Sequence, residues 1–349
     1  MASVMTANFK DASDATMESE AMALEAVAAF VLIAKNEDLA RILQTIRHME
    51  DRFNRRFHYD WVFLGTEEFS LEFKETITAY TSGAIKYSRI PADQWTVSPG
   101  INKPDFEKQL AAHVEETTLA HDIQEMYKNR FQAGFLARQT VLEEYDYIWK
   151  LKPGAEIHCD VDYDVFRYMK DKSSEYGFAI AYPNITPAVE SLWKATRAFM
   201  KEHPQYIVKD NLMDFISDDG GASYNGCLYE RNFEIASSTF WKSEAYVKYF
   251  EYLDKQPGFF ELDNHWLDGM VATIATALFL PRQSIEFFQY LGVYSEPMTA
   301  CPIEKAMRVA HNCGCASNVD FTWRMFSCVP RHFKLHQMEK PEGWELYGL

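Results

Sequence analysis

The stretch Ala28-Ala-Phe-Val-Leu-Ile-Ala34 decides the fold class of this 349-residue chain. A continuous apolar run of this length predicts a buried strand. Asn36 follows at the position of a helix N-cap, and apolar residues then recur at helical spacing from Leu39 to Phe53. Residues 59–64 form the next predicted strand. Strand, helix and strand in this order predict parallel pairing, with a nucleotide-binding crevice at the carboxyl ends of the strands.

The same alternation continues along the rest of the chain and predicts one α/β unit with a mixed central sheet flanked by helices. No repeat or low-complexity linker divides it. We expect an acidic, flexible segment over residues 1–27, a single domain over 28–335 and a tail over 336–349. Further strands are predicted at 85–89, 145–151 and 178–182, helices at 67–79, 106–137, 187–200, 243–253 and 270–280, and an irregular wrap at 311–333.

Charge and composition exclude several classes of function. The chain has 51 acidic and 35 basic residues, a formal net charge of -16, which argues against a general nucleic-acid or anionic-membrane binder. Aromatic residues make up 15% of the sequence, and they suit either sugar stacking or an aromatic core. The first 25 residues lack a basic region and a long apolar segment, so they predict neither a signal peptide nor a membrane anchor.

Six cysteines leave two possibilities open. Cys313-Gly-Cys315 has the wrong spacing for a zinc knuckle, and no paired histidine motif accompanies it. An even number of cysteines is compatible with disulfides in an oxidising compartment, and equally with free thiols.

An acidic stretch with aromatic neighbours is the first candidate site. Asp218 and Asp219 precede two glycines, and Glu234 follows in Asn232-Phe-Glu-Ile235 with Trp241 nearby. A carboxylate held against aromatic side chains is partly desolvated, so its charge acts strongly on a nearby cationic or oxocarbenium-like centre. This composition suits a carbohydrate-binding cleft. The alternative is a solvated acidic loop.

Two more features suggest phosphate or metal chemistry. Lys35 directly follows the first strand, where a phosphate or ribose would lie; an exposed lysine without a ligand is the alternative. Asp160 and Asp162 form a D-x-D pair of the kind that holds a divalent ion on a sugar nucleotide, although such pairs are common by chance.

Several motifs, taken together, resemble the fungal α-1,2-mannosyltransferases of the KRE/KTR type, glycosyltransferase family 15. They occur in the family's order over residues 30–333. The main ones are Ile46-Arg-His-Met-Glu-Asp-Arg-Phe-Asn-Arg-Arg-Phe57, Cys159-Asp-Val-Asp-Tyr-Asp-Val-Phe166, Met213-Asp-Phe-Ile-Ser-Asp-Asp219, Tyr224-Asn225 and Asn232-Phe-Glu-Ile235.

The resemblance implies a GT-A type fold, GDP-mannose as donor, manganese, and transfer to a hydroxyl acceptor with retention of the anomeric configuration. It implies that Glu234 is the nucleophile or ion-pair stabiliser, a role that retaining transfer requires. The donor side would include Lys35, Lys150, Lys152 and Asp268. The acceptor side would include Asp218, Asp219, Tyr224, Tyr229 and Glu230.

Departures from the family pattern concern the metal. The family's two metal-ligand positions correspond to Lys152 and Ser295, so both ligands are lost here and no metal residue is assigned. We therefore expect transfer without a metal, with Lys152 in place of the cation. A catalytically silent relative that binds sugars or partners is the alternative. Changes around residues 228–231 leave open whether the acceptor is a glycan or a small molecule.

The resemblance also implies the Golgi lumen as the location. Because this sequence shows neither signal nor anchor, a cytoplasmic protein or a trimmed form of a longer one is expected instead.

Overall fold

A seven-stranded mixed sheet forms the centre of the computed structural model, which describes residues 26–116, 123–262 and 264–348. All neighbouring strands are parallel except β9, which runs antiparallel to both β4 and β6. From one edge to the other the order is β10 (Ile285–Phe287), β6 (Tyr176–Phe178), β9 (Phe233–Ser237), β4 (Tyr147–Leu151), β1 (Ala28–Ile33), β2 (Asp60–Gly65) and β3 (Ile85–Arg89).

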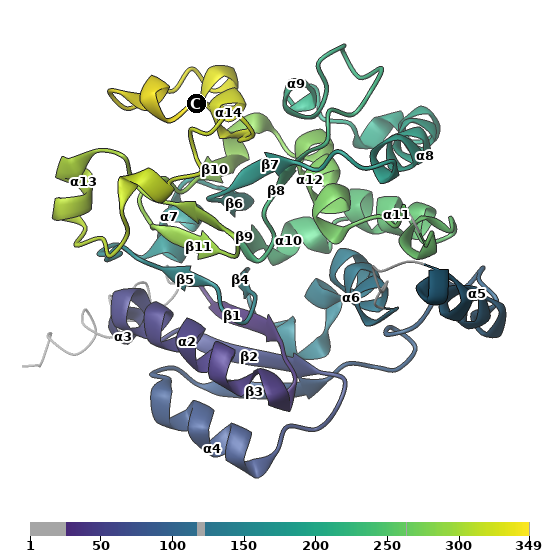
Figure 1. Cartoon of the computed structure of the whole chain (residues 1–349), viewed down its shortest axis with the longest axis horizontal. Coiled ribbons are helices and arrows are strands. Elements are labelled where there is room, and N and C mark those ends of the chain that lie inside the picture. Colours follow the sequence, from purple (N-terminus) through teal and green to yellow (C-terminus); the bar gives the residue numbers. More distant parts are fainter. Residues whose placement is uncertain (1–25, 117–122, 263, 349) are drawn as a thin grey trace, which may run out of the picture.

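Both faces of this sheet are covered by helices, because alternate side chains of each strand point to opposite faces. In β1, Ala29 and Val31 join one core, and Phe30 and Leu32 join the other. The first core includes residues of α6 (Ile123–Gly134), α8 (Ala188–Glu202), α11 (Glu244–Leu253) and α12 (Asp268–Phe279). The second includes residues of α2 (Leu39–Met49), α4 (Leu71–Tyr80) and α7 (Val165–Asp171). Figure 1 shows α2 and α4 beside β1–β3, and α6, α11 and α12 on the other side.

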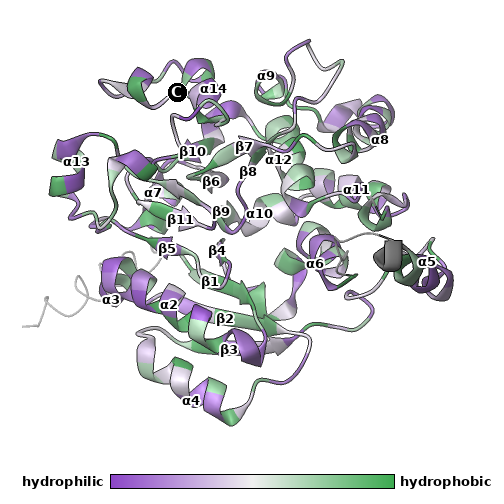
Figure 2. Ribbon diagram, viewed as in Figure 1, coloured by the Kyte–Doolittle hydropathy of each residue, from purple (hydrophilic) through white to green (hydrophobic). Residues whose placement is uncertain are grey.

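Burial on both faces agrees with the hydropathy of the central strands. In Figure 2, β1 and β2 are hydrophobic along their length, whereas α2 alternates between polar and apolar residues. Its buried residues Ile42, Ile46 and Met49 recur at the spacing of one helix face. The helix continues through a π-helical segment, Glu50–Asn54, into α3 (Arg55–Phe57).

Two small sheets complete the structure. One has the order β12 (Met298–Ala300), β11 (Val293–Ser295) and β5 (Glu156–Ile157), and the other pairs β7 (Ala181–Pro183) with β8 (Cys227–Tyr229). The remaining helices are α5 (Lys103–Glu116), α9 (Met213–Ile216), α10 (Ser238–Trp241), α13 (Lys305–Ala310) and α14 (Val329–Leu335).

The expected α/β fold is confirmed, and the differences are local. The helix expected from residue 67 begins at Leu71, because the Ser70 hydroxyl caps it by accepting a hydrogen bond from the amide of Phe73 at 3.1 Å. The strand expected over 178–182 is wrong, since the chain leaves β6 after Phe178 and enters a different sheet at β7. The wrap expected at 311–333 is also partly helical, because α14 begins at Val329.

Three disulfides settle the question of the cysteines. They join Cys159 to Cys313, Cys227 to Cys328, and Cys301 to Cys315. All six cysteines are therefore paired, and the C-terminal region is tied covalently to the loop after β5 and to β8.

The expected N-terminal segment lies almost wholly outside the described residues, so the division at residues 27 and 335 stays a prediction. Among the described residues, every helix is too short or too polar to span a bilayer.

Candidate active site: a cationic cavity above a buried charge cluster

A cavity of about 310 Å³ opens where β1 and β4 end, at the crevice that the strand order predicts. Among the described residues, its lining includes the side chains of six basic residues and two carboxylates, Asp38 and Glu125. We call it the cationic cavity; its basic residues are Lys35, Arg41, Lys128, Lys150, Lys152 and Arg231.

Most charged groups of this lining already have partners. Glu125 pairs with Lys128, and the carboxylate of Asp38 accepts a hydrogen bond from the backbone amide of Lys35 at 3.0 Å. Lys152 differs, because its exposed ammonium has no carboxylate within 4.0 Å in the described part of the chain. A diphosphate or another anion entering the cavity would therefore meet an uncompensated positive charge at Lys152.

Four buried charged residues lie directly behind this cavity, and we call them the charge cluster: Lys150, Arg231, Glu234 and Asp268. Arg231 donates to both carboxylate oxygens of Glu234, at 2.7 and 2.6 Å, and to Asp268 at 2.9 Å. The ammonium of Lys150 lies 3.5 Å from Glu234 and 3.3 Å from Asp268. Two cations and two anions balance in charge, and their close contacts offset part of the cost of removing these ions from water.

Strand pairing sets the positions of this cluster. Lys150 on β4 is the register partner of Glu234 on β9, so their side chains leave the sheet on the same face. Asp268 is the first residue of α12, and its amide donates to the side-chain oxygen of Asn129 at 3.0 Å. Tyr176 donates its hydroxyl to Glu234 at 2.9 Å. Lys150 and Arg231 also line the cationic cavity, so they connect it to the two carboxylates.

The pKa values in the cluster follow from burial and pairing. Burial alone would raise the pKa of Glu234, but Arg231 and Lys150 outweigh it and hold that pKa below its ordinary value. The pKa of Asp268 is lowered in the same way, by Lys150 and Arg231 against the effect of burial. Burial and the charge of Arg231 lower the pKa of Lys150. Both carboxylates are therefore held in their charged form.

The residues expected on the acceptor side lie elsewhere than the cavity lining. Asp218 forms an ion pair with Arg331 on the surface, and Asp219 accepts hydrogen bonds from Ser217 and Ser223 within its own turn. Tyr224 and Tyr229 are buried in the core. Glu230 is buried, and burial raises its pKa. The structure thus brings together Glu234, Lys150 and Asp268 and places Lys35 and Lys152 on the adjoining wall, whereas the assignment of acceptor residues stays a prediction.

Arg231 is the residue of the charge cluster that the sequence did not single out. Its guanidinium also stacks on Trp241, with 5.0 Å from its carbon to the ring centroid. The spacing of three residues between Arg231 and Glu234 could have indicated this contact from the sequence, because it allows a bidentate ion pair where the chain enters a strand. The D-x-D residue Asp160 has a structural role instead, because Arg52 at 2.7 Å and Asn312 at 3.2 Å donate to its carboxylate.

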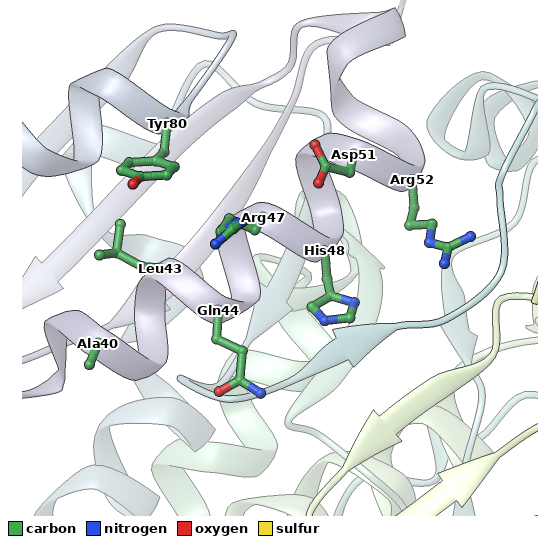
Figure 3. Close-up of a pocket in the computed structure, with 8 residues that line it drawn as sticks. All are labelled: Ala40, Leu43, Gln44, Arg47, His48, Asp51, Arg52 and Tyr80. Atoms are coloured by element: carbon green, nitrogen blue, oxygen red, sulfur yellow. The ribbon is translucent and has the colours of Figure 1, made fainter. Parts of the chain in front are cut away.

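A further cavity of about 450 Å³ runs along the outer side of α2 (Figure 3). Gln44, Arg47 and His48 line it, together with Arg52 and Tyr80 from neighbouring segments. In the part of the chain that the structure describes, it shares no lining residue with the cationic cavity. We call it the α2 groove.

Comparison with known proteins assigns the family. The profile of the family described as Glycolipid 2-alpha-mannosyltransferase matches residues 3–337. This chain belongs to that family. It is 46% identical over 324 residues to Glycolipid 2-alpha-mannosyltransferase 1 of Candida albicans, covering 92% of this chain and 74% of that protein. It is 40% identical to Alpha-1,2 mannosyltransferase KTR1 of Saccharomyces cerevisiae, covering 91% and 81%.

Solved structures agree with this assignment and with the GT-A type fold. The mannosyltransferase Ktr4p of S. cerevisiae in complex with GDP has a TM-score of 0.81 at 27% identity, covering 94% of this chain and 85% of that one. Core-mannan synthase A of Aspergillus fumigatus, in its Mn/GDP form, has a TM-score of 0.80 at 27% identity, covering 90% and 86%. As a member of this family, the protein is a glycosyltransferase.

The cationic cavity does not fit the manganese that the family implies. Manganese prefers carboxylate, carbonyl and water ligands, but the two carboxylates of this lining are engaged by Lys128 and by the amide of Lys35. At the two positions where the resemblance leads us to expect metal ligands stand Lys152, which is exposed, and Ser295, which is buried. Of the residues described, one group alone brings three His, Cys, Asp or Glu ligands together, His48 with Glu156 and His158, and none of these lines the cationic cavity.

Proposed function

We propose that this glycosyltransferase transfers mannose from GDP-mannose to a hydroxyl acceptor with retention of configuration, and that it does so without a metal ion. The family membership supports the glycosyl transfer, and the GDP complexes of two similar structures support a guanosine nucleotide donor. The observation that carries the proposal is the cationic cavity directly above the charge cluster.

Lys152 is the proposed counterpart of the missing cation. The departing GDP carries negative charge on its diphosphate, and an ammonium fixed beside it stabilises that charge through charge-assisted hydrogen bonds. The ammonium of Lys152, which has no carboxylate within 4.0 Å among the described residues, supports this role. Lys35 lies at the end of β1 on the same wall, where it would contact a phosphate or the ribose.

Lys150 and Arg231 are proposed to couple donor binding to Glu234. Both face the cavity and both are paired with Glu234 and Asp268. When a diphosphate enters, it offers these two cations additional anionic partners. The carboxylate of Glu234 is then less completely neutralised and acts on the positive charge that develops at the anomeric carbon.

Of the two roles considered for Glu234, stabilisation of an ion pair is favoured over covalent attack. Both of its oxygens already accept hydrogen bonds from Arg231, and one also accepts from Tyr176. A nucleophile has to free one oxygen before it attacks, whereas an electrostatic stabiliser acts from where it is. Asp268 holds Lys150 and Arg231 in position from the start of α12.

The acceptor is proposed to approach from the side of Glu230, with Asp218, Asp219, Tyr224 and Tyr229 shaping the surrounding segments. Glu230 follows β8 directly, and its carboxylate accepts a hydrogen bond from the amide of Asn232, a residue of the cavity lining. A glycan or a small molecule with a free hydroxyl fits this proposal.

A donor panel tests the proposed function. Thermal shift is measured with GDP-mannose, GDP-glucose, UDP-glucose and UDP-galactose, with manganese or with a chelator, and transfer is then followed with mannosides as acceptors. We expect the largest shift with GDP-mannose and transfer in the presence of chelator. A larger shift with a uridine donor contradicts the choice of donor, and binding without transfer to any acceptor favours the catalytically silent alternative.

A further inference from the structure

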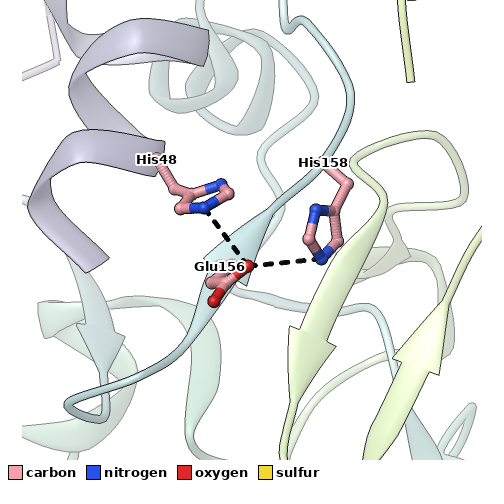
Figure 4. Close-up of side chains that lie close together, drawn as sticks. All are labelled: His48, Glu156 and His158. Atoms are coloured by element: carbon pink, nitrogen blue, oxygen red, sulfur yellow. Dashed lines mark ion pairs between the residues drawn. The ribbon is translucent and has the colours of Figure 1, made fainter. Parts of the chain in front are cut away.

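A second group of polar residues lies at the C-terminal end of α2, outside the lining of the cationic cavity. The side chains of His48 on α2, Glu156 on β5 and His158 just after β5 converge, and their ligand atoms all lie within 4.8 Å of one another (Figure 4). One oxygen of Glu156 lies 3.2 Å from Nε2 of His48 and 3.5 Å from Nε2 of His158. We propose that this group is a binding site for a divalent transition-metal ion of the zinc class.

The ligand types and their spacing fit zinc. Two imidazoles and one carboxylate form a known type of zinc ligand set, with a fourth position open to water. Tetrahedral zinc with bonds of about 2.0–2.1 Å separates its ligand atoms by about 3.3 Å. The two distances from Glu156, 3.2 and 3.5 Å, lie on either side of that value.

The surroundings orient two of the three ligands. Nδ1 of His48 lies 3.0 Å from the carbonyl oxygen of Ile157, and a carbonyl only accepts, so Nδ1 carries the hydrogen. Nε2 is then left to bind a metal, which is the arrangement that metal-ligating histidines have in proteins. The other oxygen of Glu156 accepts a hydrogen bond from the side-chain amide of Gln44, so one oxygen remains directed at the histidines.

The backbone that carries Glu156 and His158 is held firmly. Two residues apart on an extended segment, they point to the same face. The amide of His158 donates to the carbonyl of Gly292 at 2.8 Å, its carbonyl accepts from the amide of Gly314 at 2.7 Å, and the adjacent Cys159 is bonded to Cys313. A site on such a rigid segment needs little reorganisation to bind an ion.

This site is separate from the metal position that the family resemblance implies. Tyr294 pairs with Glu156 across β11 and β5, so Ser295, one residue on, points to the opposite face of this small sheet. The α2 groove provides a path for the ion, because Gln44 and His48 line it (Figure 3). The side chains of His48 and His158 are 31% and 20% exposed, so solvent reaches both.

Metal binding to the untagged full-length chain tests the proposal. The protein is stripped with chelator and titrated with zinc chloride by calorimetry, with the bound metal counted by elemental analysis and the melting temperature followed. We expect one zinc per chain, an increase in melting temperature with zinc, tetrahedral ligand-field bands with cobalt, and weaker binding of manganese than of zinc.

Matched variants identify the ligands. His48→Gln and His158→Gln should each reduce the affinity for zinc more than tenfold, and Gln44→Ala should reduce it about tenfold through the orientation of Glu156. His58→Asn is the control, because His58 is exposed in a left-handed conformation that asparagine also adopts, and it should bind zinc as the parent does. Circular dichroism in chelator verifies that each variant is folded.

Two results overturn the site. The first is parent protein that binds no zinc, which would leave a plain ion pair between Glu156 and the histidines. The second is equal zinc affinity in the parent, His48→Gln and His158→Gln. Neither result depends on transfer activity, so a failure of this proposal can be distinguished from a failure of the proposed function.

Discussion

The charge cluster and the turn that carries Asp218 and Asp219 each contain two carboxylates, yet these carboxylates have different surroundings in the fold. Glu234 is 2% exposed and paired with two buried cations, whereas Asp219 accepts hydrogen bonds from serines of its own turn and Asp218 pairs with Arg331 at the surface. A carboxylate has a strong effect on chemistry when it is removed from water and its partners face a cavity. The comparison predicts large effects for changes in the cluster and small ones for changes in the turn.

Glu234→Gln gives the largest expected effect. It removes the negative charge but keeps the shape and one hydrogen-bond acceptor, so transfer should fall by about 10²–10³-fold or more while the donor still binds. Initial rates and donor titrations on the same preparation measure both quantities. Asp219→Asn, the matched amide substitution in the turn, is the control. A Glu234→Gln variant that transfers at the parent rate contradicts the role of Glu234.

Lys152→Ala should have the next largest effect. Loss of one charge-assisted contact to a phosphate costs about 1.5–3 kcal/mol, so affinity for GDP should fall about 10- to 150-fold, with little change in melting temperature because Lys152 is exposed. Calorimetry with GDP measures the loss, and exposed Lys209→Ala is the control. The double variant Lys152→Glu with Ser295→His, which places ligands at both positions expected from the resemblance, should acquire a dependence on manganese. Undiminished GDP affinity in Lys152→Ala would remove Lys152 from the donor site.

The acid stability of the cluster is the third prediction. The pKa values of Glu234 and Asp268 lie below their ordinary values of 4.5 and 3.8, so their contribution to stability is fully present above those values and is lost as the pH falls through the lower pKa values of the folded state. The melting temperature, measured between about pH 3 and pH 7, should therefore drop at the acid end. Glu234→Gln should be less stable than the parent at neutral pH, because removing one partner of a buried ion pair costs about 3–5 kcal/mol. Its melting temperature should also fall less than that of the parent as the pH is lowered. Parallel melting curves for parent and variant would contradict the pairing.

Substitutions in the turn are expected to have the smallest effect. Asp218→Asn removes one surface ion pair, and exposed pairs contribute little, so the KM for the acceptor should change less than about fivefold and kcat should stay as it is. Asp219→Asn should behave similarly. Steady-state kinetics with varied acceptor concentration measures both. A large loss of kcat in either variant would place these carboxylates in the reaction and end the contrast with Glu234.

Much of the fold follows from local patterns. Continuous apolar runs predicted β1 and β2, and the stripe from Leu39 to Phe53 predicted α2, because these segments are buried in the way their periodicity requires. The break between Phe178 and Ala181 was missed, since each half is apolar and only long-range pairing assigns them to different sheets. Six cysteines allow 15 pairings, so the sequence could not choose among them.

The resemblance to the family predicted Glu234, Lys150 and Asp268 as site residues. The contacts between residues of the site were visible only in the structure. The bidentate contact between Arg231 and Glu234 depends on the path of the backbone just before β9, and the sequence does not reveal that path. His48 and Glu156 are separated by more than a hundred residues, and only the packing of α2 against β5 brings them together. The Glu-Ile-His spacing of residues 156–158 was the one local signal of that group.

Transfer of mannose from GDP-mannose in the presence of chelator is the most direct test that cations of the chain replace a metal in the donor site. The assay is run on the parent protein and on His158→Gln. An effect of chelator through the proposed zinc site is thereby distinguished from an effect at the donor site. We predict that the variant, whose second site binds the ion more weakly, transfers at the same rate with and without chelator. Transfer abolished by chelator in both proteins and restored by manganese would contradict the account.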